Sequence, residues 1–402
     1  MAVTATGDAS RFFAEAVKGF NQFGQPTREI HEGPIRYLLN EFWTSGQRQA
    51  HSLHEVSYRA CFKPQLPAFF IQRLTQPGDS VYDPFMGRGT TPIQAALLGR
   101  RPVGNDINPL SLLLTRPRRA PPAPADVARR LEQIRWDEEK TADSDLLAFY
   151  SPRTLRHLYA LRSWLIERAP LDRPPDPIDD WIRMVALNRL TGHSPGFFSV
   201  YTLPPNQAVS ARSQRKINQR RGQTPPDRDI KALILKKTAA LLRDGPMPPH
   251  PPPLLTVGAA ASTPAIVSGS VRLVVTSPPF LDIVQYAEDN WLRSWFAGID
   301  PAGVAIAQHR TEAGWQNMVR NTLIELARVV KPGGNIAFEV GEVRAGKILL
   351  ERLAWEAAEG LPFERLFVMV NQQEFSKTAN CWGVGNNAKG TNTNRIIILC
   401  RH

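Results

Sequence analysis

The sequence predicts an α/β protein whose sheet is interrupted by a largely helical, proline-broken insertion. Short β-rich runs bounded by Gly, Pro or Asn occur before the middle third of the chain, in PGDSVYD and RRPVGND, and after it, in SVRLVVTS, GNIAFEV, RLFVMV and RIIILC. The middle third holds amphipathic helical stretches separated by proline-rich runs. Because proline is excluded from central strands and resists helix, these runs indicate linkers or extended loops. The outer parts are therefore predicted to be halves of one sheet.

This pattern divides the 402 residues into four parts. A helical N-terminal extension is expected over residues 1–49, and the first half of the α/β domain over 50–115. An inserted basic helical region follows over 116–253, and the second half of the domain over 254–402. A chain of this length can bury a substantial core.

Composition excludes several classes of protein. No apolar stretch approaches the ~20 residues of a membrane span, and the first residues lack the basic and apolar regions of a signal peptide. A soluble, cytoplasmic protein without a membrane partner is expected. The three cysteines, Cys61, Cys381 and Cys400, lie far apart with no CxxC spacing, so neither a disulfide framework nor a structural metal site is predicted.

Charge favours a polyanionic partner. The net charge is +12, and residues 212–244 carry ten Lys and Arg against three Asp, or +7. A solvated basic face is the alternative interpretation of such a run. If the run binds nucleic acid, the candidate contacts at its N-terminal end are Arg212, Arg215, Lys216, Arg220 and Arg221.

A glycine loop is the first stretch with chemical meaning. A strand over 80–82 leads to a turn with Gly87 and Gly89, then a helix with Thr91 as its predicted N-cap. Glycine lets a backbone approach a ligand closely. The next strand ends at Asp106, 17 residues beyond Gly89, near the ~20 typical of a carboxylate that holds a ribose. The loop lacks both a third glycine and Gly-Lys-Ser/Thr, which favours a nucleoside cofactor without a pyrophosphate.

The run DPFMGRGTT closely resembles the DPFxGxGTT cofactor motif of S-adenosylmethionine-dependent DNA amino-methyltransferases. The resemblance implies S-adenosyl-L-methionine as cofactor and a seven-stranded Rossmann-like class I methyltransferase sheet. It also implies a cofactor pocket shaped by Asp83, Pro84, Phe85, Gly87, Gly89, Thr90, Thr91 and Asp106. Upstream, Lys63 and Pro64 match a family segment that lies beside the methionine end of the cofactor, although Pro64 would equally suit an ordinary helix start.

A second motif, TSPPF, ends the strand SVRLVVTS. Two consecutive prolines hold the backbone rigidly at the carboxyl edge of the sheet, where open α/β sheets bind ligands. The Ser277 hydroxyl and the Pro278 carbonyl could accept hydrogen bonds from an exocyclic amine, and Phe280 could stack on an extruded base. TSPPF resembles the family's catalytic motif, which implies catalytic roles for Ser277, Pro278, Pro279 and Phe280. In this family serine at the first position is typical of cytosine N4 enzymes, whereas adenine N6 enzymes usually carry Asp or Asn.

Three further segments carry weaker predictions. LLTVGAAAST resembles the third strand of the family but lacks the acidic residue that often follows it near the adenine ring. The aromatic residues of 282–298 could face the target base or belong to the core. The Asn-rich segment near 373–394 is expected to be a long hairpin between the last two strands, and contact with DNA and a plain loop are equally compatible with it.

These observations predict a site-specific DNA methyltransferase that flips a cytosine out of duplex DNA and methylates its N4 amine, with residues 116–253 as target-recognition region. Cytosine C5 chemistry would need a nucleophilic cysteine, generally after proline, but Ala60, Asn380 and Leu399 precede the three cysteines. Adenine N6 methylation of DNA, methylation of an RNA base and non-catalytic DNA binding stay open as alternatives. A cognate restriction endonuclease would fit a restriction-modification system, nucleoid association would fit the substrate, and the oligomeric state is left open.

Overall fold

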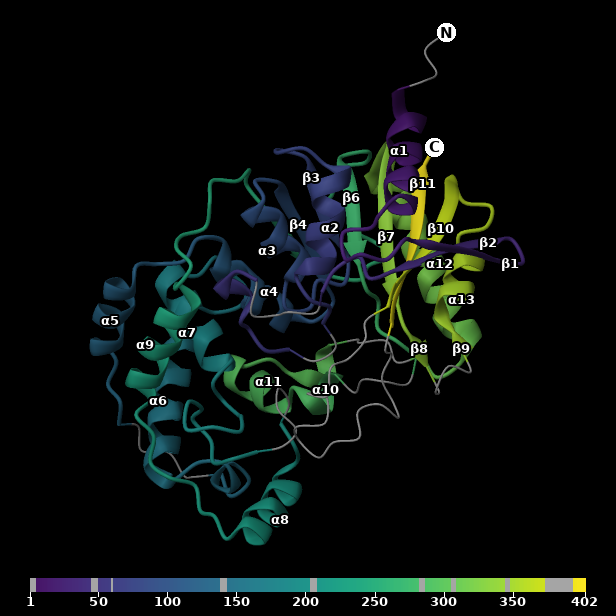
Figure 1. Ribbon diagram of the computed structural model, residues 1–402. Coiled ribbons are helices and arrows are strands. Elements are labelled where there is room, and N and C mark those ends of the chain that lie inside the picture. Colours follow the sequence, from purple (N-terminus) through teal and green to yellow (C-terminus); the bar gives the residue numbers. More distant parts are fainter. Residues whose placement is uncertain are drawn as a thin grey trace.

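The computed structural model of the chain is organised around a nine-stranded sheet (Figure 1). It describes residues 5–44, 50–58, 61–137, 143–202, 208–281, 286–304, 309–343, 348–372 and 393–402. The strands are β1 (Arg28–Glu32), β2 (Ile35–Asn40), β3 (Ser80–Asp83), β4 (Arg101–Asp106), β5 (Leu254–Val257), β6 (Val271–Thr276), β7 (Val330–Val340), β10 (Phe363–Gln372) and β11 (Thr393–Arg401), with β8 (Glu342–Val343) and β9 (Ile348–Leu349) in a separate pair.

The strand order β1-β2-β10-β11-β7-β6-β3-β4-β5 contains the predicted seven-stranded sheet. Strands β5, β4, β3, β6 and β7 are parallel neighbours, and β11 runs antiparallel between β7 and β10. The pairing of β3 with β6 joins the two halves of the chain across the insertion. The prediction of one Rossmann-like α/β sheet built from both halves is therefore confirmed.

The N-terminal part departs from its prediction as a purely helical extension. It holds α1 (Ala5–Lys18), but β1 and β2 then extend the sheet beyond β10. In β2 the run IRYLLN is buried almost throughout, because it lies parallel to β10 with Tyr37 opposite Val368. Such a continuous apolar run lacks the alternation of a half-exposed strand, so its period did not reveal it.

Helices cover both faces of the sheet (Figure 1). On one face α1, α2 (Gln65–Leu74) and α3 (Thr90–Leu97) pack against alternate strand residues such as Val81, Leu273 and Val275. On the other, α12 (Glu312–Val329) and α13 (Leu350–Ala357) pack against Tyr82 and Val274. Because helices cover both faces of the sheet, the ends of the parallel strands are the part of the sheet that these helices leave uncovered.

The insertion has a helical core of its own. Its helices are α5 (Pro124–Glu132), α6 (Pro152–Arg168), α7 (Pro177–Leu187), α8 (Ala211–Arg221) and α9 (Ile230–Leu241), together with the short turns η3 (Arg116–Arg119) and η4 (Leu146–Ala148). Helices α4 (Pro109–Thr115) and α11 (Trp291–Ala297) from the flanking halves pack into the same core. Short turns elsewhere are η2 (Ser52–His54), α10 (Tyr286–Asp289) and η5 (Pro301–Gly303). Trp291 contacts Phe149 and Trp295 contacts Tyr159, so these two aromatic residues serve as core.

Candidate active site

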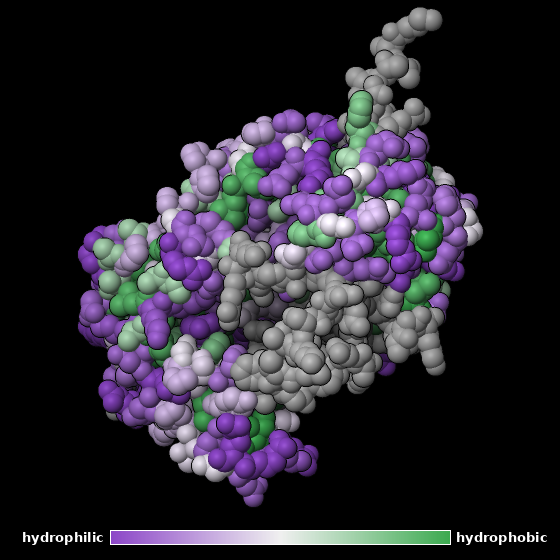
Figure 2. Space-filling view, viewed as in Figure 1, coloured by the Kyte–Doolittle hydropathy of each residue, from purple (hydrophilic) through white to green (hydrophobic). Residues whose placement is uncertain are grey.

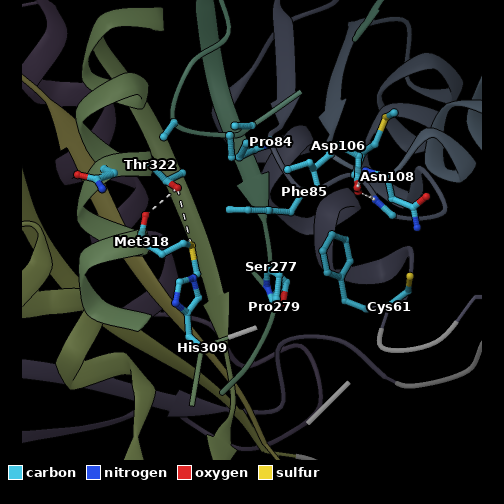
Figure 3. A pocket seen from close by; sticks show the side chains of 18 of the residues that line it. Cys61, Pro84, Phe85, Asp106, Asn108, Ser277, Pro279, His309, Met318 and Thr322 are labelled. Atoms are coloured by element: carbon cyan, nitrogen blue, oxygen red, sulfur yellow. Dashed lines mark hydrogen bonds between the residues drawn. The ribbon is translucent and has the colours of Figure 1, made fainter. Parts of the chain in front are cut away.

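A cavity of about 300 Å³ opens at the carboxyl ends of β3, β4 and β6 (Figure 3). Its walls include both the glycine loop and the TSPPF strand end. Of the residues predicted for the site, those that line it are Pro84, Phe85, Gly87, Thr90, Asp106, Ser277 and Pro279. The two motifs, nearly 190 residues apart in sequence, thus share one concave site, which is the arrangement that their chemistry requires.

The other predicted residues do not line this cavity. They are Lys63, Pro64, Asp83, Gly89, Thr91, Pro278 and Phe280. Pro64 precedes α2 directly, so the ordinary helix start fits it. Burial lowers the pKa of the half-buried Lys63 ammonium. Pro278 is buried, and Phe280 packs against the core beneath α12.

The glycine loop turns sharply into α3. Gly89 has a φ of 76° and takes the N-cap position, so α3 begins at Thr90 and the prediction of Thr91 as N-cap is wrong. Glycine adopts this left-handed conformation without steric cost, so the chain can turn into the helix at Gly89. A Cβ at Gly89 would lie 2.3 Å from Thr115 Oγ1. Thr91 instead donates its hydroxyl to the Val275 carbonyl at 3.0 Å, which ties the loop's helix to the catalytic strand.

Asp106 holds the same loop from below. Its Oδ2 accepts the Gly87 N–H at 2.8 Å, and its Oδ1 accepts the Asn108 N–H at 2.9 Å. Burial raises the pKa of this carboxyl. Each carboxylate oxygen has a further lone pair, and the side chain lines the cavity. Asp106 can therefore accept a ligand hydroxyl while it holds the loop.

Asp83 acts beneath the site instead of in it. It is 1% exposed, and its Oδ1 accepts the Phe85 N–H at 3.1 Å and the Thr276 hydroxyl at 2.6 Å. Loss of hydration raises the pKa of this carboxyl to about 7. The contact joins the start of the glycine loop to the residue before Ser277, so the two motifs are held in register by one buried group.

The TSPPF segment is supported by β7 and α12. Thr276 lies opposite Phe338 in the parallel β6–β7 pair, and the next residues, Ser277 and Glu339, are hydrogen-bonded through their side chains. Glu339 also accepts the Asn394 amide at 2.9 Å, and burial raises the pKa of its carboxyl. The indole of the fully buried Trp315 donates to the Pro279 carbonyl at 2.8 Å.

Sequence reasoning missed much of the lining. The remaining residues of the cavity are Tyr58, Cys61, Phe62, Met86, Ile107, Asn108, Ala259, Ala260, Ala261, His309, Asn317, Met318, Asn321 and Thr322. The sequence of the loop after β5 shows only that the acidic residue frequent in the family is absent there, and the sequence of α12 carries no motif. His309 is of interest because its Nε2 is buried and has no hydrogen-bond partner within the part of the chain that the structure describes. Only the folded structure shows that α12 contributes residues to the cavity.

The five predicted DNA contacts lie on α8, and all five are exposed. Helix α8 lies at the lower end of the molecule in the view of Figure 1, and its surface is strongly hydrophilic in Figure 2. The segment before α8 is tied to the catalytic half, because the Ala208 N–H donates to the Asp289 carbonyl and the Trp291 indole to the Val209 carbonyl, each at 3.2 Å. The rest of the basic run is partly paired: Lys231 with Glu132, and Lys237 and Arg243 with Glu55.

Two absences hold for the described residues. They contain no group of three side chains able to ligate a metal ion. None of their helices combines the length and apolar character needed to span a membrane. The predicted hairpin between β10 and β11 falls on residues 373–392, which lie outside the described residues, as does Cys381.

Comparison with known proteins agrees with this site. The family model described as DNA methylase matches residues 14–113. The Type II methyltransferase M.MjaII of Methanocaldococcus jannaschii is 39% identical over 67 residues, which cover 17% of this chain and 12% of that protein. The Type II methyltransferase M.MvaI of Kocuria varians is 29% identical over 143 residues, which cover 35% and 27%. The match thus spans about a quarter or less of the length of these curated relatives.

Among solved structures, a putative DNA modification methylase of Thermus thermophilus, complexed with S-adenosyl-L-methionine, is 18% identical over 36% of this chain and 53% of that one. Its TM-score is 0.22, so it adds nothing to the assignment. The family match contains the whole glycine loop and Asp106, the residues that the structure brings to Ser277. Over residues 14–113, which include the glycine loop, this chain is similar to the DNA methylase family.

Proposed function

We propose that this protein transfers a methyl group from S-adenosyl-L-methionine to an exocyclic amine of a base in DNA. The observation that carries the proposal is the shared cavity, in which Gly87 and Asp106 form one wall and Ser277 and Pro279 another. The finer proposal is that the acceptor is the N4 amine of a cytosine flipped out of duplex DNA. Ser277, at the first position of the SPPF motif, supports cytosine.

The residues present fit S-adenosyl-L-methionine. Asp106 would hold the ribose hydroxyls, and the left-handed turn at Gly87 lets the backbone come close to the ligand. Phe85, Ile107 and Ala260 supply apolar surface for the rings. When bound, the cofactor supplies a methyl group on a positively charged sulfonium. No site for a pyrophosphate is needed, which agrees with the absent third glycine.

The chain's own groups would act on the amine. Because the Ser277 hydroxyl donates a hydrogen bond to Glu339, the lone pairs of Ser277 Oγ are free to accept an amine N–H. With the Pro278 carbonyl as second acceptor, the nitrogen lone pair leaves conjugation with the ring and points at the methyl carbon. The bound cofactor would supply the methyl group to the amine held in this way, the demethylated cofactor would leave, and the amine proton would pass to water. Catalysis is mostly by positioning, a contribution that can reach ~7–11 kcal/mol.

Nucleoside analysis tests both levels of the proposal. Duplex DNA is incubated with protein and cofactor, digested to nucleosides and analysed by mass spectrometry, with Ser277→Ala as the inactive control. We expect N4-methylcytosine from the wild type alone. N6-methyladenosine without N4-methylcytosine would defeat the cytosine assignment and leave the DNA methyltransferase. Sequencing the methylated bases of a genome that carries the protein would give the recognition site.

Two other functions make different predictions. An RNA base methyltransferase would transfer a tritiated methyl group to tRNA and not to duplex DNA. A DNA-binding protein without activity would bind DNA but show no affinity for S-adenosyl-L-methionine. The glycine loop beside Ser277 disfavours a protein that binds no cofactor, and the match to the DNA methylase family model favours DNA over RNA. Action on DNA would place the protein with the nucleoid.

We also propose that the inserted region contacts the DNA. Exposed cations of α8 would supply phosphate contacts, and other surfaces of the insertion would read the sequence. This proposal stands on exposure, on charge and on the link between α8 and the segment that follows TSPPF.

A further inference from the structure

Three cations form a row along the exposed face of α8. Arg212, Lys216 and Arg220 are spaced four residues apart, so successive side chains lie one above the other. At a rise of 1.5 Å per residue the row is about 12 Å long. All three side chains are exposed, and the described part of the chain records no carboxylate within ion-pair distance of any of them.

The other two predicted contacts are already engaged within the protein. Arg215 donates to the Ser144 carbonyl at 2.8 Å and to the Asp145 carboxylate at 2.6 Å. The Arg221 guanidinium lies over the Tyr201 ring, 3.9 Å from its centre. These contacts hold α8 to the insertion. Arg215 and Arg221 therefore have a structural role, although they carry the same charge as the three residues of the row.

Polar contacts on the opposite face fix α8 in place. The Gln214 side chain is fully buried and donates to the Tyr201 carbonyl at 3.0 Å. The Asn218 amide donates to the Ala148 carbonyl at 2.8 Å. Because this face is held, the row of Arg212, Lys216 and Arg220 points outward. The helix presents the row without having to rearrange.

The row is unfavourable for the free helix. Like charges four residues apart destabilise a helix, and cations near the N-terminus oppose the helix dipole. The first turn of α8 carries Arg212 and no acidic residue. A fixed helix that keeps such an arrangement on its outer face is better explained by a polyanionic ligand than by its own stability.

We propose that Arg212, Lys216 and Arg220 contact the phosphate backbone of duplex DNA beside the target nucleotide, while Arg215 and Arg221 anchor α8 to the protein. The choice of DNA rests on the proposed function. Phosphates follow each strand at about 3.4 Å along the duplex axis, so a 12 Å row of cations can meet several of them. The bonds from Ala208 to Asp289 and from Trp291 to Val209 place this contact in continuity with the catalytic segment.

Salt-dependent binding to duplex DNA tests the row. Affinities of Arg212→Gln, Lys216→Gln, Arg220→Gln and the triple variant are measured by fluorescence anisotropy between about 50 and 200 mM salt. Each single variant should lower the slope of log K against log [salt] by about 0.9, and the triple variant by nearly three times that. The matched controls are Arg129→Gln and Arg156→Gln, exposed arginines of the insertion paired with Asp126 and Asp137, which should keep the wild-type slope.

Melting temperature and cofactor binding complete the test. The row variants should melt at or above the wild-type temperature, because like charges are removed, and should bind S-adenosyl-L-methionine as the wild type does. Arg221→Gln should melt lower. If the row variants keep the wild-type slope, or if the controls lower the slope equally, the proposed phosphate contact by the row is wrong. The proposal of methyl transfer would be unaffected by this result. A slope change seen with tRNA and not with duplex DNA would also overturn it. The expected slopes in a protein without cofactor affinity would support the row and sink the proposed function.

Discussion

The Ser277 hydroxyl is hydrogen-bonded to the carboxylate of Glu339, which lies on the neighbouring strand β7 and is 5% exposed. The contact exists because β6 and β7 are parallel and Thr276 lies opposite Phe338. Glu339 thus accepts the hydrogen bond that the hydroxyl can donate, and the oxygen of Ser277 can accept a hydrogen bond from a ligand. We infer that Glu339 is a positioning residue that acts through Ser277.

Replacing Glu339 should slow the reaction without weakening cofactor binding. In Glu339→Gln an amide N–H can face Ser277, so the hydroxyl can turn away and one lone pair of its oxygen accepts from the amide instead of the substrate. A cost of about 1–3 kcal/mol for a mismatched buried contact corresponds to a loss of about 5- to 150-fold in kcat. Single-turnover rates and cofactor affinity are measured together, and Glu339→Asp should recover part of the rate. A normal rate in Glu339→Gln would exclude the role.

Asp83 should make stability depend on pH. Its pKa is raised from 3.8 to about 7, so the folded state binds a proton that the unfolded state has released in this window. The stability that this proton contributes is present below about pH 4 and is lost as pH rises to about 7. Over the whole window the loss is about 4 kcal/mol.

The variant Asp83→Asn should remove this dependence. The asparagine oxygen can still accept from Phe85 and Thr276, and no charge has to be buried. Urea unfolding from pH 4.5 to 8 should show the variant gaining on the wild type as pH rises. Asp126→Asn, a surface change, is the control. Parallel curves for Asp83→Asn and the wild type would show that Asp83 is not the source.

Gly89→Ala should destabilise the protein by about 2–4 kcal/mol. Its Cβ would meet Thr115, and its φ of 76° is strained for alanine. Gly99→Ala separates the two causes, because Gly99 has a φ of 72° with nothing within 4 Å of its Cβ. That control should cost about 1–2 kcal/mol. Thermal unfolding of both variants measures the two losses of stability. Equal losses would mean that Thr115 moves aside at no cost and that only the strained φ destabilises Gly89→Ala.

His309→Leu should change ligand binding more than stability. The Nε2 of His309 is buried at the cavity with no hydrogen-bond partner among the described residues, so loss of this atom leaves none of their groups newly unpaired. We expect an unchanged or slightly higher melting temperature and a higher KM for cofactor or DNA. Melting curves and steady-state kinetics with each substrate varied in turn test this. A large drop in melting temperature with normal KM values would assign His309 a structural role.

Local patterns were enough for some features of the site. The left-handed Gly87, the acid at the end of β4 and the two prolines after β6 each follow from residue chemistry over a few positions, and the structure places Gly87, Asp106 and Pro279 around one cavity. Local patterns failed where a residue acts through distant contacts. The motif predicts Asp83 in the pocket, but its carboxylate lies beneath the pocket and accepts from Thr276; the helix pattern predicts Thr91 as a cap, but its hydroxyl donates to the Val275 carbonyl.

By itself the sequence determined the α/β class, the two motifs and the excess of positive charge, because strand period, glycine and proline geometry and charge are properties of neighbouring residues. Only the tertiary structure decided that β1 and β2 extend the sheet, that α12 and Glu339 complete the site, and which α8 cations are already engaged. Those features depend on pairings between residues far apart in the chain, and such pairings form only when the whole core is packed.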